Sequence, residues 1–182
     1  FKYRGLNKDF GPFNISQITE YCREMHDLMS GMNVVNNKHD RSYDRGSRLL
    51  PSGAAGTVAL VLHCDPAPRN IANQIVLMSA FLISTFNFRA IDVAHLFSDI
   101  QKKLLPFRDC GVRPSVMDLT IEDVARALEL AVKRRWWDRR QFDIDGYRYF
   151  GDINEGDLNW VLPGRILAMS SPSSYKTDGG LA

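Results

Sequence analysis

A run of β-type residues leads into a short loop and then into a long apolar helix, and this succession constrains the fold most. Thr57 to His63 (TVALVLH) is continuous and β-branched, as expected of a strand covered on both faces. The helix predicted from Arg69 to Phe86 contains the most apolar segment of the chain, Ile75 to Ile83. A strand that feeds a loop and then buried helices predicts an α/β domain, with a central sheet flanked by helices.

Three further helices are predicted from residue periodicity. Asn14 begins the first, which should end at Gly31, because an asparagine side chain can accept from the unpaired amides of the first turn. Thr120 begins another, since Thr120 and Asp123 resemble a capping box. The third spans 89–103. Its inner side is predicted to carry Ile91, Val93, Ala94, Phe97 and Ile100.

The composition of the chain changes near residues 150–160. Residues 142–159 place five carboxylates among aromatic residues and are predicted to be a linker that packs at intervals, whereas Trp160 to Met169 is strand-like again. We therefore assign 1–150 to one domain and 151–182 to a linker and the start of a second domain that is cut off. The polar segment 36–56 is predicted to be a mobile loop.

The overall charge limits the classes of expected binding partner, and the cysteines indicate the redox setting. The chain has 182 residues, with 23 Lys and Arg against 21 Asp and Glu, and the net charge of +2 creates no field that would select nucleic acid or an anionic membrane. The apolar stretch at 75–83 is shorter than the roughly 20 residues that cross a bilayer, so no membrane span is predicted. Cys22, Cys64 and Cys110 are odd in number and form no CxxC pair, which favours a reducing, intracellular setting without disulfides.

No metal, cofactor or nucleic acid is expected from the remaining motifs. The four histidines stand in no metal-ligand spacing, and His63 is interpreted as a hydrogen-bonded histidine at a strand end. The segment 133–141 (KRRWWDRRQ) could stack bases or act as a nuclear-import signal. We favour a structural reading, in which the cations lie near helix C-terminal carbonyls and the tryptophans pack in the core.

The loop after the predicted strand resembles a catalytic phosphate loop in outline only. Cysteine-dependent phosphatases need a cysteine, five residues and an arginine, so that backbone amides surround the phosphate. Here four residues separate Cys64 from Arg69, and Pro66 and Pro68 have no N–H to donate. Asp65 would repel both a thiolate and a phosphate. The loop is therefore predicted to be degenerate, and no catalytic residue is assigned.

Six stretches of this chain resemble the mitotic-exit dual-specificity phosphatases, the cell-division-cycle-fourteen family. They run in the family's order with similar spacing and cover nearly the whole chain. They are FGPFNISQITEYC at 10–22, VLHCDPAPRNIAN at 61–73, LLPFRDCG at 104–111, LTIEDVARAL at 119–128, FDIDGYRYF at 142–150 and GDLNWVLPGRILAMSSP at 156–172.

The resemblance implies a tandem of two phosphatase-like domains joined by a linker helix. In that family the amino-terminal domain lacks the nucleophile and helps to shape the groove for phosphoprotein substrates. This chain would be that domain, and its partner would be its own downstream catalytic domain, with the active Cys-x5-Arg loop beyond Ala182. Cell-cycle and mitotic roles in the nucleus, the cytoplasm or at the spindle pole are implied by the same analogy.

The resemblance also implies a set of groove residues. The aspartate of the PFRD loop is preserved as Asp109, whereas the acidic positions of the linker are occupied by Arg148 and Gly151. A cation there would discourage a basic substrate residue. Asp152 and Glu155 are the nearby candidates to replace the missing acids.

Two alternatives to a phosphatase groove domain stay open from the sequence. One is a pseudophosphatase that serves as a structural or scaffolding protein without activity, and the other is a compact enzyme with an unusual site at Cys64. The sequence makes no prediction of the oligomeric state.

Overall fold

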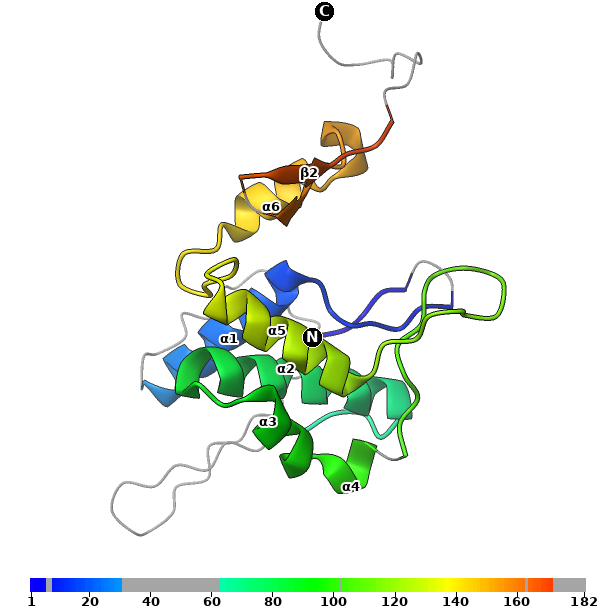
Figure 1. Cartoon of the computed structure of the whole chain (residues 1–182), viewed down its shortest axis with the longest axis vertical. Helices are drawn as coiled ribbons and strands as arrows, with labels where there is room; N and C mark the ends of the chain where they lie inside the picture. The colour runs from blue at the N-terminus through cyan, green and yellow to red at the C-terminus, as the bar shows by residue number, and fades with distance from the viewer. Residues whose placement is uncertain (6–7, 31–62, 102, 163, 172–182) are drawn as a thin grey trace, which may run out of the picture.

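The computed structural model describes residues 1–5, 8–30, 63–101, 103–162 and 164–171 (Figure 1). The predicted loop at 36–56 and the predicted strand at 57–63, except His63, lie outside these residues. The elements, in chain order, are the helices α1 (Ile15–Met29), α2 (Pro68–Phe86), α3 (Ala90–Leu96), α4 (Ser98–Gln101), α5 (Ile121–Lys133) and α6 (Ile144–Phe150), the 3-10 helix η1 (Ile153–Glu155), and the strands β1 (Asn159–Leu162) and β2 (Ile166–Ala168).

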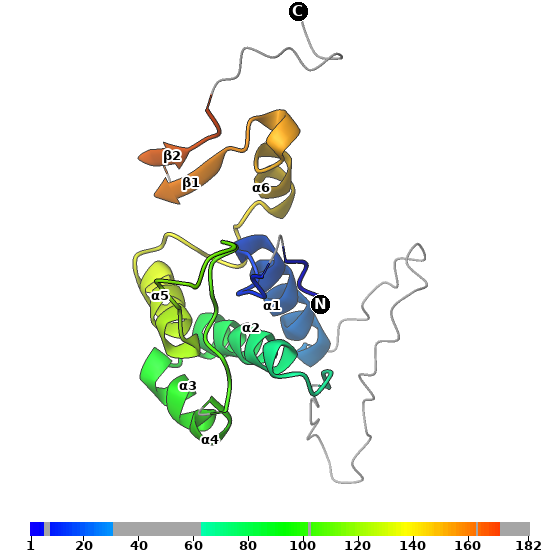
Figure 2. The ribbon, with the colours of Figure 1, turned by 90° about the vertical axis from the view of Figure 1, so that its right-hand side faces the viewer.

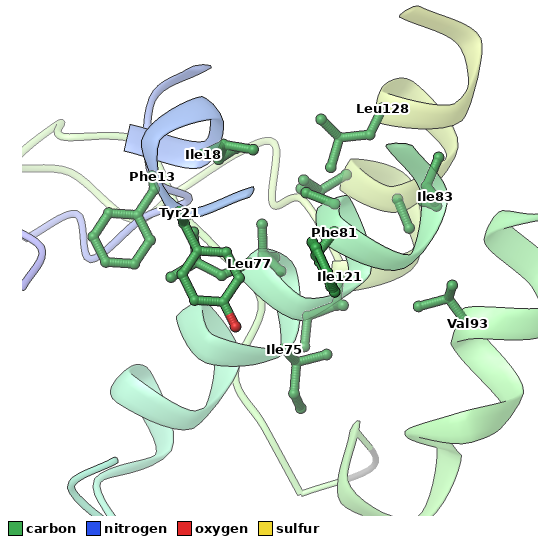
Figure 3. Close-up of a cluster of buried hydrophobic side chains, with 14 of the residues drawn as sticks. Phe13, Ile18, Tyr21, Ile75, Leu77, Phe81, Ile83, Val93, Ile121 and Leu128 are labelled. Atoms are coloured by element: carbon green, nitrogen blue, oxygen red, sulfur yellow. The ribbon is translucent and has the colours of Figure 1, made fainter. Parts of the chain in front are cut away.

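Helix α2 is the centre of the hydrophobic core. It packs against α1 on one side and α5 on the other, while α3 packs against both α2 and α5. Figure 3 shows Leu77 and Phe81 of α2 near Ile18 of α1 and Leu128 of α5, and all four side chains are buried. Burying a side chain of this size contributes about 1.5–3 kcal/mol, so these contacts fix the three helices relative to one another.

Both predicted helix caps are confirmed. The Asn14 side chain accepts from the backbone N–H of Gln17 at 3.0 Å, and the Gln17 side chain accepts from the Asn14 backbone in return. Thr120 and Asp123 form the same reciprocal pair, at 3.1 Å and 2.9 Å. The first helix ends at Met29, two residues before the predicted end at Gly31.

The prediction of one continuous helix over 89–103 is wrong, because this segment forms two helices. The chain leaves helical geometry at Phe97, where φ is −109° and the side chain packs against the core, and this break separates α3 from α4. Val93 is fully buried as predicted, but Ile91, which faces away from Val93 on α3, and Ile100, which follows the break, are 37% and 46% exposed.

The prediction that both tryptophans at 136 and 137 pack in the core holds for one of them. Trp137 is 4% exposed, whereas Trp136 is 46% exposed. Arg135 has a φ of +56°, in the left-handed region, so the chain turns there. After this turn, one of the two neighbouring rings is exposed and the other is buried.

The described residues contain one small sheet, in which β1 and β2 pair antiparallel with an irregularity between Trp160 and Leu162. The predicted mixture of helices and strands is confirmed, but the described ranges show no central sheet flanked by helices. Phe107 and Leu119 add an isolated antiparallel bridge before α5.

Helix α6 and the hairpin lie beyond one end of the α1–α5 body. Figure 2, turned by 90° from Figure 1, shows them above α1, while α3 and α4 lie at the opposite end. An ion pair of 2.8 Å between Arg148 of α6 and Glu20 of α1 connects the two parts. Among the described helices, none is long and apolar enough to span a membrane.

Candidate functional site

The loop before α2 folds on itself through the side chain of Asp65. One carboxylate oxygen of Asp65 accepts from the backbone N–H of Ala67 at 2.9 Å. Pro66 and Pro68, on either side of Ala67, have no N–H, so the carboxylate already occupies one of the two amides that the four residues between Cys64 and Arg69 offer. The loop therefore presents a negative charge where a phosphate loop presents hydrogen-bond donors.

The arginine of the loop faces an aromatic ring. The guanidinium carbon of Arg69 lies 5.2 Å from the centre of the Phe10 ring, a cation–π contact, and Arg69 is exposed. The backbone carbonyl oxygens of Phe10 and Arg69 both accept from the side-chain amide of Asn73, the latter at 3.2 Å. Asn73 thus ties the first turns of α2 to the segment before α1.

The thiol of Cys64 is chemically unsuited to act as a nucleophile. Burial raises the pKa of Cys64, and the adjacent Asp65 carboxylate raises it further. A thiol with a raised pKa is largely protonated at neutral pH, and the thiolate is the reactive form. In cysteine-dependent catalysis the surroundings must act in the opposite direction and lower the thiol pKa.

A cavity of about 360 Å³ lies beside the degenerate loop. The amino-terminal residues form one part of its lining and the first turns of α2 form another. The lining residues are Phe1, Lys2, Tyr3, Phe13, His63, Cys64, Asp65, Asn70, Asn73 and Gln74. Arg69 does not line this cavity, so the structure places Cys64 and His63 together but directs the arginine elsewhere.

The PFRD loop is rigid around an outward-facing Asp109. Phe107 is 2% exposed and holds the start of the loop in the core. The Arg108 guanidinium donates to the carbonyl oxygens of Gly111 at 2.9 Å and Arg113 at 2.7 Å. The Asp109 carboxylate accepts from the Gly111 N–H at 3.2 Å, yet its side chain stays 54% exposed and can receive a further donor.

The four linker residues named from the sequence make different local contacts. Asp152 caps η1 by accepting from Asn154, both from its backbone N–H and from its side-chain amide. Glu155 forms a hydrogen bond with the Tyr149 hydroxyl that raises the pKa of Tyr149. Arg148 is paired with Glu20, and Gly151 is the C-cap of α6.

The structure brings some of the predicted site residues together and leaves others apart. His63 and Cys64 share the cavity, and Asp152 and Glu155 share one short turn. Asp109 belongs to a different loop, between α4 and α5. The described part of the chain holds no group of three or more His, Cys, Asp or Glu side chains that could bind a metal ion.

The sequence analysis missed Asn73. This residue is 3% exposed, and its amide holds two backbone carbonyl oxygens, while its own Oδ1 has no partner among the described residues. The available signal was a polar amide within the apolar run of α2 at 71–77. A buried amide in such a position is usually hydrogen-bonded across elements.

Comparison with known proteins shows what this chain is similar to. Residues 47–131 match the family described as "Dual specificity protein phosphatase, N-terminal half". Dual specificity protein phosphatase CDC14A of Homo sapiens is 26% identical over 93% of this chain, and tyrosine-protein phosphatase cdc-14 of Caenorhabditis elegans is 28% identical over 98%. The chain is similar to CDC14 phosphatases over nearly its whole length. It matches the amino-terminal domain of CDC14 proteins, and the resemblance noted in the sequence is confirmed.

The match covers a limited share of each relative. The chain spans about a quarter of the length of the curated CDC14 phosphatases: 25% of the human CDC14A protein, 25% of CDC14AB of Danio rerio and 23% of the worm protein. Within the family-model match, residues 63–101 and 103–131 are described, and they contain α2 to α4, most of α5 and the loop with Asp109.

Proposed function

We propose that residues 1–150 form the non-catalytic domain of a dual-specificity Ser/Thr/Tyr protein phosphatase, one wall of its phosphoprotein-binding groove. Residues 151–182 would lead through a linker into the catalytic domain. The observation that carries this proposal is the loop at Cys64, where the Asp65 carboxylate occupies the Ala67 amide and raises the pKa of the thiol. Such a loop repels phosphate, so the chemistry must take place elsewhere in the protein.

The exposed apolar side chains of the hairpin support a following domain. Trp160 and Val161 of β1 are 58% and 65% exposed, and Ile166 and Leu167 of β2 are 55% and 41% exposed. A two-stranded hairpin is marginally stable alone, and these side chains would be covered if it joined a larger sheet. We assign this sheet to the catalytic domain.

Asp109 is the strongest candidate for a direct substrate contact. Its carboxylate is 54% exposed, and the surrounding loop is held by Arg108, so the charge is presented at a fixed position. Glu155 and Asp152 are secondary candidates, because they lie beside the linker positions that the resemblance implies to be acidic, whereas Asp109 occupies its own position in the PFRD loop. An acid in such a groove would select a cationic substrate residue.

Arg148 weakens the preference of this groove for a basic substrate residue, compared with a groove that has an acid at each of the positions implied by the resemblance. Its guanidinium donates to Glu20 at 2.8 Å and remains 47% exposed, so a positive charge faces solvent where the resemblance implies an acid. A basic substrate residue nearby would be repelled. We infer that this protein tolerates phosphosites without a downstream basic residue.

The catalytic assignment is tested with the full-length protein that contains this chain. With p-nitrophenyl phosphate as substrate, Cys64→Ser should leave kcat within about twofold of the native value, because this thiol takes no part in the chemistry. Asp109→Ala should raise KM for phosphopeptides more than it lowers kcat, since it removes a binding contact. Turnover abolished by Cys64→Ser, or an unchanged KM for Asp109→Ala, would refute the respective assignment.

The specificity inference is tested by changing the charge at Arg148 in the same protein. Arg148→Glu should raise kcat/KM for a phosphopeptide with a downstream lysine relative to the same peptide with alanine. Arg148→Ala serves as the matched control, because it breaks the Glu20 ion pair without reversing the charge. An unchanged lysine-to-alanine ratio in both variants would contradict the inference.

The cellular setting is proposed by analogy with the family. We infer an intracellular protein of the nucleus, the cytoplasm or the spindle pole. Imaging the fluorescently tagged protein through mitosis tests this, and a steady extracellular or membrane signal would refute it.

A further inference from the structure

The turn after α5 exposes three arginines and a tryptophan within seven consecutive residues. Arg134, Arg135 and Arg140 are exposed, and the Trp136 side chain is 46% exposed. We call these four residues the Arg–Trp surface. None of them belongs to the loop at Cys64 or to the groove candidates Asp109, Asp152 and Glu155.

The backbone below the Arg–Trp surface is fixed by two contacts with α1. Arg23 donates to the carbonyl oxygens of Arg139 at 2.6 Å, Phe142 at 2.7 Å and Arg140 at 3.3 Å. The buried indole of Trp137 donates to the Thr19 hydroxyl at 2.9 Å. The exposed side chains therefore project from an anchored turn. Binding of a ligand would not carry the entropy cost of ordering the backbone.

The positive charge of this surface is not neutralised within the described part of the chain. Lys133, just before the turn, is already paired with Glu129 at 2.5 Å. Arg134, Arg135 and Arg140 form no ion pair with any described residue. Asp138 is the acid within the turn, and its carboxylate accepts from the backbone N–H of Arg140 at 2.8 Å. Three guanidinium groups against one carboxylate leave a local excess of positive charge.

We propose that the Arg–Trp surface binds an acidic segment of a partner protein, in which carboxylates flank an apolar side chain. Arginine forks bind carboxylates in two-bond geometry, and the half-exposed Trp136 ring on the same turn offers a flat apolar contact. Tryptophan and arginine are also the residues that most often dominate the binding energy of protein interfaces.

Nucleic acid fits this surface less well. Binding to a phosphate backbone grows with the number of neutralised phosphates, and the surface offers three arginines in a chain whose net charge is only +2. A single exposed ring would stack one base, whereas single-strand binding sites use several. An acidic peptide needs no more charge or aromatic area than the four residues provide.

The test uses the full-length protein and two fluorescein-labelled peptides in anisotropy titrations. One peptide is rich in glutamate with a central Phe-Leu pair, and the other has glutamine at every glutamate position. We expect the acidic peptide to bind more tightly, and its affinity to fall as salt is added. The triple variant Arg134→Glu, Arg135→Glu, Arg140→Glu should weaken binding by about tenfold or more, and Trp136→Ala should weaken it as well.

A charge-matched variant controls for the overall change in charge. Lys103→Glu, Arg113→Glu, Arg165→Glu reverses three exposed cations elsewhere on the chain and should leave the peptide affinity unchanged. Equal affinity of the Arg–Trp triple variant and this control would overturn the proposal. So would failure of the native protein to bind the acidic peptide, whether or not it binds single-stranded RNA or phosphatidylserine vesicles.

Discussion

The two adjacent tryptophans allow a stability prediction with an internal control. Trp137 is 4% exposed, and its ring buries about 150–250 Å² of surface, so at about 25 cal/mol per Å² its burial contributes about 4–6 kcal/mol as an upper bound. Trp137→Ala also removes the indole hydrogen bond to Thr19, whose hydroxyl still donates to the Ile15 carbonyl oxygen at 2.6 Å. We therefore expect the free energy of unfolding to fall by about 3–5 kcal/mol.

Trp136→Ala is the matched control, because the same side chain is removed one position earlier. Its ring is 46% exposed, so we expect a loss of about 1 kcal/mol or less. Urea denaturation followed by far-ultraviolet circular dichroism measures both, since helix content reports unfolding without relying on tryptophan fluorescence. A Trp137→Ala variant that loses no more stability than Trp136→Ala would show that the turn after α5 is not anchored in the core.

Three further predictions concern a glycine, the cysteines and a helix cap. Gly11→Ala should lower the free energy of unfolding by about 2 kcal/mol or more in urea titrations, because φ is +146° and a Cβ atom would collide with Asn73. Iodoacetamide, followed by mass spectrometry, should label the exposed Cys110 before Cys64, whose pKa is raised. Cys22 should react only on unfolding, because burial raises its pKa to about 11. Asp123→Asn should cost up to about 1 kcal/mol near neutral pH, and the difference should shrink in acid.

The hydrogen bonds of the helix cap explain why the stability loss of Asp123→Asn should shrink in acid. The Thr120 hydrogen bonds lower the pKa of Asp123 below its ordinary 3.8, so its stabilising contribution is present above that pH and is lost as pH falls through the folded-state pKa. A deficit in the stability of Asp123→Asn that persists unchanged into strong acid would contradict this.

For the Gly11→Ala prediction, Gly164→Ala is the control, since φ is +70° but nothing lies near the added Cβ atom. Cys64 labelled faster than Cys110 at neutral pH would contradict the raised pKa.

Helix starts could be predicted from the sequence because they depend on neighbouring residues. The caps at Asn14 and Thr120 each involve a partner three residues away, and both formed as expected. The break at Phe97 could not be predicted in this way. It depends on how that ring packs against helices distant in sequence, and periodicity alone continues through it.

The candidate site shows the same division between local and distant contacts. Missing amides at Pro66 and Pro68 are a covalent property, so the degenerate loop could be recognised from the sequence. The placement of Arg69 over Phe10, and the role of Asn73, depend on residues about sixty positions away. The partner of Arg148 is likewise Glu20, a residue of the first helix that no spacing rule indicates.

The Arg148–Glu20 ion pair has a mechanical consequence. It joins α6 to α1 through two side chains that are 47% and 40% exposed, so water and dissolved ions weaken the joint. The orientation of the linker against the helical body should therefore loosen as ionic strength rises. The movement would be confined to α6 and the hairpin, because the preceding turn is anchored to α1 through Arg23 and Trp137.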